Sequence, residues 1–159
     1  MNEAHRQLAG ALGRIPSGLF IVTARRDGLE TGMLASWVQQ CSFAPPMLSL
    51  AVKQGRYLAD WLAEGAAFTV NVLERDQSDM IAHFGRGFAP GEPAFEGVDV
   101  RRPDDGGPIL NEALAYLECR VAGAYPAGDH RLLVARVERG GMLNDGQPLI
   151  HVRKNGLHY

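Results

Sequence analysis

Short runs of apolar residues, separated by turns, dominate the pattern of this 159-residue chain. Most of the runs are rich in β-branched and aromatic residues, which predicts strands. The predicted strands cover residues 19–24, 31–42, 47–52, 67–73, 113–125, 131–138 and 148–152. Apolar residues recur at helical spacing in residues 3–14, 56–64 and 77–84. Asp76 is the expected N-cap of the last of these helices.

The connections between the predicted strands are mostly short. The Asp-Gly pair at 27–28 is typical of a hairpin turn. The two prolines at 45–46 cannot donate to a central ladder, so a corner or an edge is expected there. Residues 126–130 are too few for a crossover helix, which makes the strands around them antiparallel. Residues 85–108 are predicted as a long surface loop with a short strand over 98–101, and such a loop is a candidate lid or partner contact.

Six or seven strands joined by hairpins, with two or three short helices, favour a closed antiparallel barrel. The expected fold class is therefore mainly β with short α-helices. Strands and helices do not alternate regularly, and no GxGxxG follows a strand, which argues against a doubly wound nucleotide fold. No linker or internal repeat divides the chain, so residues 1–159 are expected to form a single domain.

Composition narrows the classes of function. A net charge of −2 argues against a nucleic-acid surface or a basic membrane patch. No apolar run approaches the roughly 18 residues of a membrane span, and the N-terminus lacks a signal-peptide core, so a cytoplasmic location is expected. Two distant cysteines and five scattered histidines do not have metal-site spacing, so no metal is expected. Cys41 and Cys119 are both predicted to be buried thiols.

The strongest local signal for a ligand is the sequence Lys53-Gln54-Gly55-Arg56, where a strand should give way to a helix. The N–H groups at a helix N-terminus attract phosphate, and Lys53 and Arg56 would add full positive charges. Taken alone, these residues are also compatible with a solvated basic turn.

Small and hydroxyl residues stand among bulky apolar ones between Met33 and Ser42. Small residues such as Ala35 let a flat ring lie against the backbone, while Ser36 and Ser42 offer hydroxyl groups to phosphate or ribityl oxygens. Trp37 suits a ring contact, although a core position is commoner for a lone strand tryptophan. Together with the basic turn, these residues favour a flat phosphorylated ligand, which we interpret as a flavin.

The remaining candidates for chemistry are few. Asp129 and His130 stand at a tight turn, where a histidine is commonly just exposed. A functional His130 would contact a cofactor or help to seat nicotinamide. The sequence has no GxSxG elbow and no paired carboxylates for glycoside hydrolysis. A bound cofactor is therefore expected to supply the chemistry.

Several segments, in order, resemble the flavin reductase-like FMN-binding domain, especially the version at the C-terminus of cyanobacterial flavodiiron proteins. They are GLFIVTA (18–24), LASWVQQCSFAPPMLSLAVKQGR (34–56), FTVNVL (68–73), HFGRGFAPG (83–91), ALAYLEC (113–119), GDH (128–130) and HVRKNGLHY (151–159). The resemblance covers nearly the whole chain. Without the di-iron and flavodoxin-like domains of those proteins, oxygen reduction at iron is not expected, and the electron acceptor is open.

The resemblance implies an FMN-binding split β-barrel, an antiparallel Greek-key barrel, that forms a homodimer with FMN near the subunit interface. It implies flavin reduction by NADH or NADPH, with FAD as the alternative cofactor and a partner oxygenase or another electron acceptor as partner. In this chain Lys53 and Arg56 would hold the phosphate, and His130 would be the catalytic residue near the flavin or nicotinamide. The full set of implied flavin-site residues is Met33, Leu34, Ala35, Ser36, Trp37, Cys41, Ser42, Phe43, Val52, Lys53, Arg56, Phe84, His130 and Tyr159.

Two alternatives remain open at this point. One is a flavin carrier or electron-transfer flavoprotein without NADH activity. The other is a haem-binding split barrel, for which His130 or His83 would be the axial ligand. The basic turn suits FMN better than haem, because a phosphate monoester is the natural partner of clustered cations.

Overall fold

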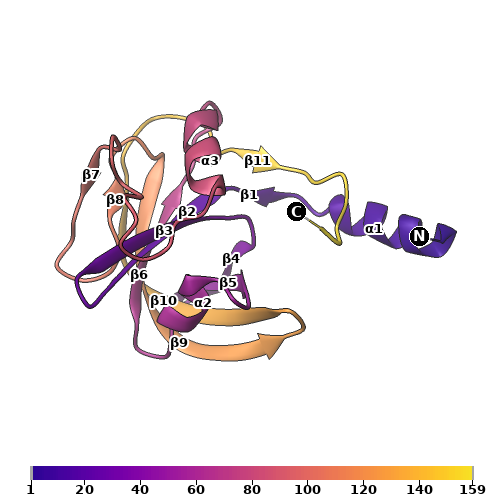
Figure 1. Cartoon of the computed structure of the whole chain (residues 1–159), viewed down its shortest axis with the longest axis horizontal. Coiled ribbons are helices and arrows are strands. Elements are labelled where there is room, and N and C mark those ends of the chain that lie inside the picture. The colour runs from indigo at the N-terminus through magenta and orange to yellow at the C-terminus, as the bar shows by residue number, and fades with distance from the viewer. Residues whose placement is uncertain (1, 159) are drawn as a thin grey trace.

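The computed structural model describes residues 2–158 and is built around one seven-stranded antiparallel sheet (Figure 1). Across the sheet the strands follow the order β3-β2-β6-β9-β10-β5-β4. Their bounds are β2 Phe20–Arg26, β3 Leu29–Ala35, β4 Val38–Phe43, β5 Pro46–Lys53, β6 Ala67–Val72, β9 Ala115–Ala127 and β10 His130–Met142. The prediction of a mainly β fold with short helices is confirmed.

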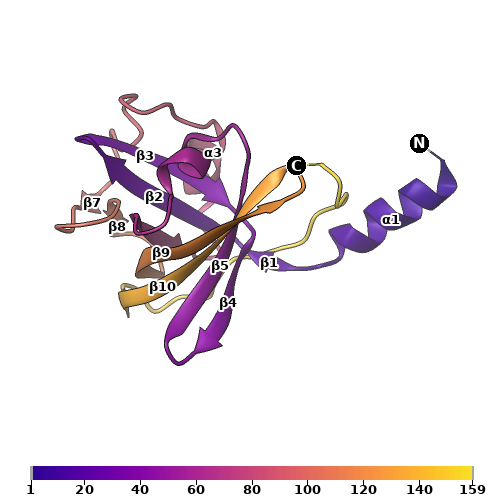
Figure 2. The ribbon, with the colours of Figure 1, turned by 90° about the horizontal axis from the view of Figure 1, so that it is seen from below.

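The two outer strands of this sheet, β3 and β4, are consecutive in the chain and are separated only by Ser36 and Trp37. The edges of the sheet must therefore approach each other at this link, which curves the sheet toward a barrel (Figure 2). The backbone N–H of Ala51 donates to the Trp37 carbonyl at 3.1 Å and ties the link to β5. The prediction of one strand over residues 31–42 was wrong, because a continuous run of strand-forming residues does not reveal a change of pairing partner.

The connection after β5 skips two strands. The chain passes through the short helix α2 (Tyr57–Trp61) and enters β6, which lies beside β2, while β9 and β10 occupy the positions between β5 and β6. Such a connection across intervening strands is Greek-key connectivity. The helix predicted over residues 56–64 is shorter than expected, because Leu62 leaves the helical conformation at ψ 60°.

The main core lies between the curved faces of this sheet. Val22, Leu50, Phe68, Val70 and Leu133 come from β2, β5, β6 and β10, and all are at most 1% exposed. Burying one such side chain stabilises a fold by about 1.5–3 kcal/mol. The core therefore fixes the positions of β3, β5 and the link between β3 and β4.

A second hydrophobic cluster lies beneath α3 (Ser78–Gly85), which packs against β3. Phe84 of α3 is buried there, and a Cβ on Gly32 would lie 2.8 Å from its ring, so the glycine permits this close packing. The predicted N-cap, Asp76, was wrong. Gln77 occupies the cap position, and its side chain accepts a hydrogen bond from the Glu74 N–H at 2.8 Å.

The N-terminal helix and the C-terminal segment are in contact outside the barrel, where the Gly156 N–H donates to the Ala9 carbonyl. Helix α1 (Glu3–Gly13), capped by Asn2, projects away from the sheet, and the C-terminal segment runs back beside it (Figures 1 and 2). Strand β1 (Ser17–Gly18) pairs with β11 (Ile150–His151) in a separate antiparallel ribbon. The strand predicted over residues 148–152 is therefore shorter and lies outside the main sheet.

Two further predictions were partly correct. In the long loop, β7 (Val100–Arg101) lies within the predicted strand, but its partner β8 (Ile109–Leu110) was not predicted. Cys119 is buried as expected, whereas Cys41 is exposed. Cys41 lies on the outer strand β4, where residues 39–41 are all exposed. The prolines at 45–46 lie where the edge strand β4 turns into β5, and Pro46 is the first residue of β5.

Candidate functional site

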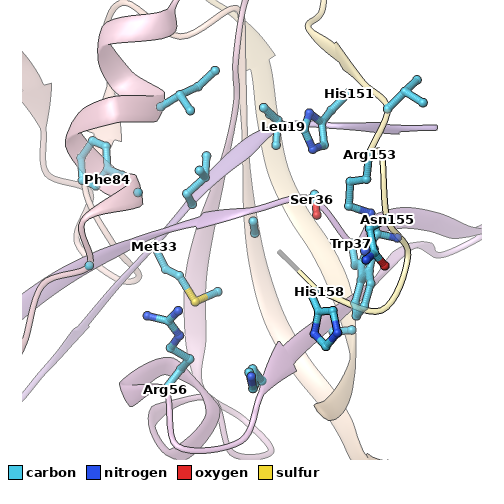
Figure 3. Close-up of a pocket in the computed structure, with 18 of the residues that line it drawn as sticks. Leu19, Met33, Ser36, Trp37, Arg56, Phe84, His151, Arg153, Asn155 and His158 are labelled. Atoms are coloured by element: carbon cyan, nitrogen blue, oxygen red, sulfur yellow. The ribbon is translucent and has the colours of Figure 1, made fainter. Parts of the chain in front are cut away.

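A cavity of about 660 Å³ opens where the β3–β4 link, the turn after β5, α3 and the C-terminal segment meet (Figure 3). Its volume lies within the range of roughly 300–1,000 Å³ that is typical of small-molecule sites. The described residues that line it are Leu19, Met33, Leu34, Ala35, Ser36, Trp37, Ala51, Lys53, Arg56, Ile81, Phe84, Gly85, Gly87, His151, Val152, Arg153, Lys154, Asn155 and His158.

One wall of the cavity is largely apolar. Met33 and Leu34 come from the end of β3, and Ile81 and Phe84 come from α3. Ala35 completes this wall with a side chain of a single methyl group, so a flat ligand can approach the backbone. Phe84 is itself buried in the second hydrophobic cluster, which fixes the position of the wall.

The β3–β4 link forms the neighbouring part of the cavity. Ser36 presents the only hydroxyl group among the described lining residues. Trp37 lies beside it, and the Arg153 guanidinium stands over the indole ring at 4.9 Å from its centroid. The link thus offers a hydrogen-bonding group and an aromatic ring next to the apolar wall.

The basic turn predicted from the sequence reaches the cavity. Lys53 ends β5, Gly55 adopts a left-handed conformation at φ +85°, and Arg56 precedes α2. Both cations line the cavity. Because α2 has only five residues, the positive charge of this turn comes mainly from the two side chains.

The C-terminal segment contributes lining residues that the predicted set did not include. Arg153, Lys154 and Asn155 line the cavity, together with His151 and His158. The signal that could have identified them is the basic Arg-Lys pair between two histidines, which is similar in kind to the basic turn at Lys53. None of the described lining residues is Asp or Glu, so the cavity presents strongly cationic walls.

His130 lies behind the cavity and is not among its lining residues. Its side chain is buried, and the centroid of its ring lies 4.8 Å from that of Trp37. Nδ1 of His130 donates to the Asp129 carboxylate at 2.7 Å, which lowers the pKa of Asp129. His83, the other haem-ligand candidate, bonds the Ala94 carbonyl at 2.7 Å and is also outside the lining.

The structure brings together eight of the predicted flavin-site residues in the cavity lining: Met33, Leu34, Ala35, Ser36, Trp37, Lys53, Arg56 and Phe84. Five others lie outside this lining: Cys41, Ser42, Phe43, Val52 and His130. Cys41, Ser42 and Phe43 lie farther along β4, and the Phe43 side chain is 90% exposed. Val52 points into the barrel core. Tyr159 lies outside the described residues, and the proposed roles of all these residues stay predictions.

Residues 2–158 contain neither a metal-binding cluster nor a membrane-spanning helix. No group of three or more His, Cys, Asp or Glu side chains could hold a metal ion there. No helix in the same part of the chain has the length and hydropathy needed to cross a membrane.

Comparison with known sequences gives a consistent result. Residues 12–156 match the family model described as "Flavin reductase like domain". The chain is 43% identical over 150 residues to the putative diflavin flavoprotein A 3 of Synechocystis sp. The match covers 94% of this chain and 25% of the relative. It is 39% identical over 154 residues to the diflavin flavoprotein A 1 of the same organism, and this match covers 96% of this chain and 27% of the relative. The chain thus spans about a quarter of the length of these curated relatives.

Comparison with solved structures supports the fold. The NADH:FAD oxidoreductase SgcE6 of Streptomyces globisporus C-1027 superposes with a TM-score of 0.85 at 27% identity, covering 96% of this chain and 91% of that chain. SgcE6 in complex with NAD and FAD fragments superposes with a TM-score of 0.81 at 26% identity, covering 94% of this chain and 88% of that chain. BorF is the flavin reductase component of a bacterial two-component tryptophan halogenase. It superposes with a TM-score of 0.81 at 27% identity, covering 95% of this chain and 94% of that chain. The predicted split-barrel fold is confirmed.

Proposed function

Because the chain belongs to the flavin reductase like domain family, we propose that it is an NAD(P)H:flavin oxidoreductase with FMN as its flavin. The observation that carries the proposal is the cavity itself, in which an apolar wall meets cationic side chains. A flavin mononucleotide has the matching features, a flat apolar ring system at one end and an anionic phosphate at the other. The volume of about 660 Å³ is sufficient for such a ligand.

In this proposal each part of the cavity holds one part of FMN. Lys53 and Arg56 bind the phosphate, and the Arg56 guanidinium can donate two parallel hydrogen bonds to it. Ser36 bonds a polar atom of the ribityl chain or ring. Met33 provides apolar surface for the ring, and the buried Phe84 fixes the wall from behind. A monophosphate suffices for this turn, which favours FMN over FAD.

The bound flavin would supply the redox chemistry by accepting a hydride from a reduced nicotinamide. The residues of the chain then have to position the two rings and exclude water, which requires close approach rather than a strong acid or base. His130 contacts Trp37 and not the cavity, so we assign it the role of a positioning residue that fixes the indole ring. The reduced flavin would serve an electron acceptor or a partner oxygenase.

We also propose that the chain forms a homodimer. Phe43, Ile15, Met142 and Ile150 are large apolar side chains that are exposed in a single chain. A second copy that covers such side chains would remove apolar surface from water, which stabilises association. Sedimentation equilibrium of the purified protein tests this, and a monomer at all micromolar concentrations would contradict it.

The first experiment measures FMN affinity by quenching of flavin fluorescence. Replacing both Lys53 and Arg56 by alanine should weaken FMN binding at least 100-fold, because two charge-assisted interactions, each of about 1.5–3 kcal/mol, are lost. The matched control replaces Arg14 and Arg75, two exposed arginines outside the cavity lining, with the same change in net charge. The control should change the affinity by less than about twofold. Equal effects of the two double variants would contradict the phosphate role.

The second experiment separates the reductase from a flavin carrier. The FMN-loaded protein is mixed with NADH or NADPH in a stopped-flow instrument, and the visible flavin absorption is followed. Bleaching within the time of catalytic turnover, roughly a second or less, supports the reductase. Retention of FMN with no bleaching by either donor would overturn the reductase proposal and leave the carrier.

A further inference from the structure

The cavity holds two cationic pairs, and the proposed FMN phosphate accounts for only one of them. Lys53 and Arg56 form the first pair, and Arg153 and Lys154 of the C-terminal segment form the second. Figure 3 shows Arg56 on one side of the pocket below Met33, and Arg153 on the other side beside Trp37. A phosphate monoester carries about two negative charges at neutral pH, which the first pair balances.

The second pair is held in place by α1. The backbone N–H of Gly156 donates to the Ala9 carbonyl at 2.8 Å. A Cβ on Gly13 would lie 2.7 Å from the Arg153 carbonyl oxygen, so the segment passes α1 at a distance that only glycine allows. This contact fixes the backbone that carries Arg153 and Lys154 at the mouth of the cavity.

The side chain of Arg153 is also held in place, by its contact with Trp37. Its guanidinium carbon stands over the Trp37 ring at 4.9 Å from the centroid, and a guanidinium has five N–H donors with which to bind an anion. Among residues 2–158 neither Arg153 nor Lys154 forms an ion pair with a carboxylate. Two uncompensated cations at the edge of a cavity favour a second anionic group.

We propose that Arg153 and Lys154 bind the diphosphate of the nicotinamide dinucleotide and thereby set the affinity for the electron donor. The proposal rests on the proposed reductase function. A nicotinamide ring must stack on the flavin to react, so its diphosphate has to leave the cavity close to the ring, away from the flavin phosphate. A diphosphate linkage carries two negative charges, which match the second pair in number and position.

The test measures binding of the unreactive donors NAD⁺ and NADP⁺ to the FMN-loaded full chain by isothermal titration calorimetry. Arg153→Ala combined with Lys154→Ala should raise both dissociation constants at least tenfold, because charge-assisted hydrogen bonds to the diphosphate are lost. The FMN dissociation constant should change by less than twofold. Arg153→Lys should recover part of the affinity, and the Arg14→Ala, Arg75→Ala control should behave as wild type.

Each outcome has a separate meaning. Dinucleotide affinity that is unchanged in the double variant would overturn this proposal while the reductase function stands. FMN affinity that falls together with dinucleotide affinity would also overturn it, because the segment would then belong to the flavin site. Failure of the wild-type protein to bleach with either reduced donor would instead remove the reductase function. Thermal unfolding of the variant at the wild-type temperature shows that the fold is retained.

Discussion

Two regions of very different construction line the same cavity. The barrel supplies the β3–β4 link and the basic turn at Lys53 from strands that share a buried core. The second region, here called the arm, consists of α1, the β1–β11 ribbon and residues 152–158. The arm supplies the second cationic pair, yet its strands are two residues long and its helix projects from the barrel (Figure 1).

The difference in burial predicts a difference in stability. The barrel residues that define the cavity are backed by side chains at most 1% exposed, such as Leu50 and Phe68. In α1, by contrast, Leu8 is 52% exposed, and only Ala9 and Gly13 are buried. Segments with few buried apolar contacts open locally at a lower free energy than the core does. One side of the cavity therefore belongs to a well-buried core, and the other side is held by a few local contacts.

The barrel core should contribute far more to the free energy of unfolding than the arm does. Phe68→Ala should lower the free energy of unfolding by about 3–5 kcal/mol, since it leaves a cavity in the core. Leu8→Ala, on the exposed face of α1, should change it by less than about 0.5 kcal/mol. Urea unfolding followed by circular dichroism measures both. A loss for Leu8→Ala similar to that for Phe68→Ala would show that the arm belongs to the cooperative core.

The two glycines of α1 differ in how closely the C-terminal segment approaches them. An alanine Cβ at Gly13 meets the backbone of Arg153 and Asn155, whereas nothing lies within 4 Å of a Cβ at Gly10. Gly13→Ala should displace the segment and speed tryptic cleavage after Arg153 several-fold, a local loss on the order of 1 kcal/mol.

Gly10→Ala is the matched control on the same helix. It should leave the cleavage rate equal to or below that of wild type, because alanine favours the helix over glycine by roughly 0.8–1 kcal/mol. Mass spectrometry of the fragments identifies the cleavage at Arg153. Equal cleavage rates in the two variants would show that α1 does not hold the segment.

The same contrast explains which parts of the molecule the sequence could predict. Most barrel strands carry their own local signal, either a dense run of β-branched residues, as in residues 67–73, or a short turn, as in residues 126–130. The basic turn at Lys53 was found for a similar reason, because both cations and the glycine lie within four residues. Eight residues of the predicted flavin site therefore line one cavity.

The parts that could not be predicted depend on contacts between distant segments. Ser17–Gly18 and Ile150–His151 are too short to show any periodicity, so nothing local indicated that they pair and bring Arg153 to the cavity. The break at Ser36 and Trp37 was missed because it appears only when the partners of β3 and β4 are known. The position of His130 behind Trp37 likewise follows from the tertiary structure.

The smallest expected effect concerns four side chains in successive contact, here called the column, that join the barrel to the arm: Asp129, His130, Trp37 and Arg153. Asp129 and His130 belong to the barrel, and Trp37 lies between His130 and the Arg153 side chain of the arm in this series of contacts. The hydrogen bond from His130, with a smaller contribution from the charge of Lys53, lowers the pKa of Asp129 below the ordinary 3.8. Nuclear magnetic resonance titration of the Asp129 carboxyl group measures this shift directly.

The sign of the pH dependence follows from the direction of that shift. Because the native pKa of Asp129 is below 3.8, its contact with His130 stabilises the fold fully above that pH and is lost as the pH falls through the native value. Asp129→Asn should therefore lower stability slightly at neutral pH, and its difference from wild type should shrink in acid. His130→Ala should return the pKa of Asp129 toward 3.8. If that pKa stays low without the imidazole, the contact is not its cause, and the barrel end of the column is held by another group.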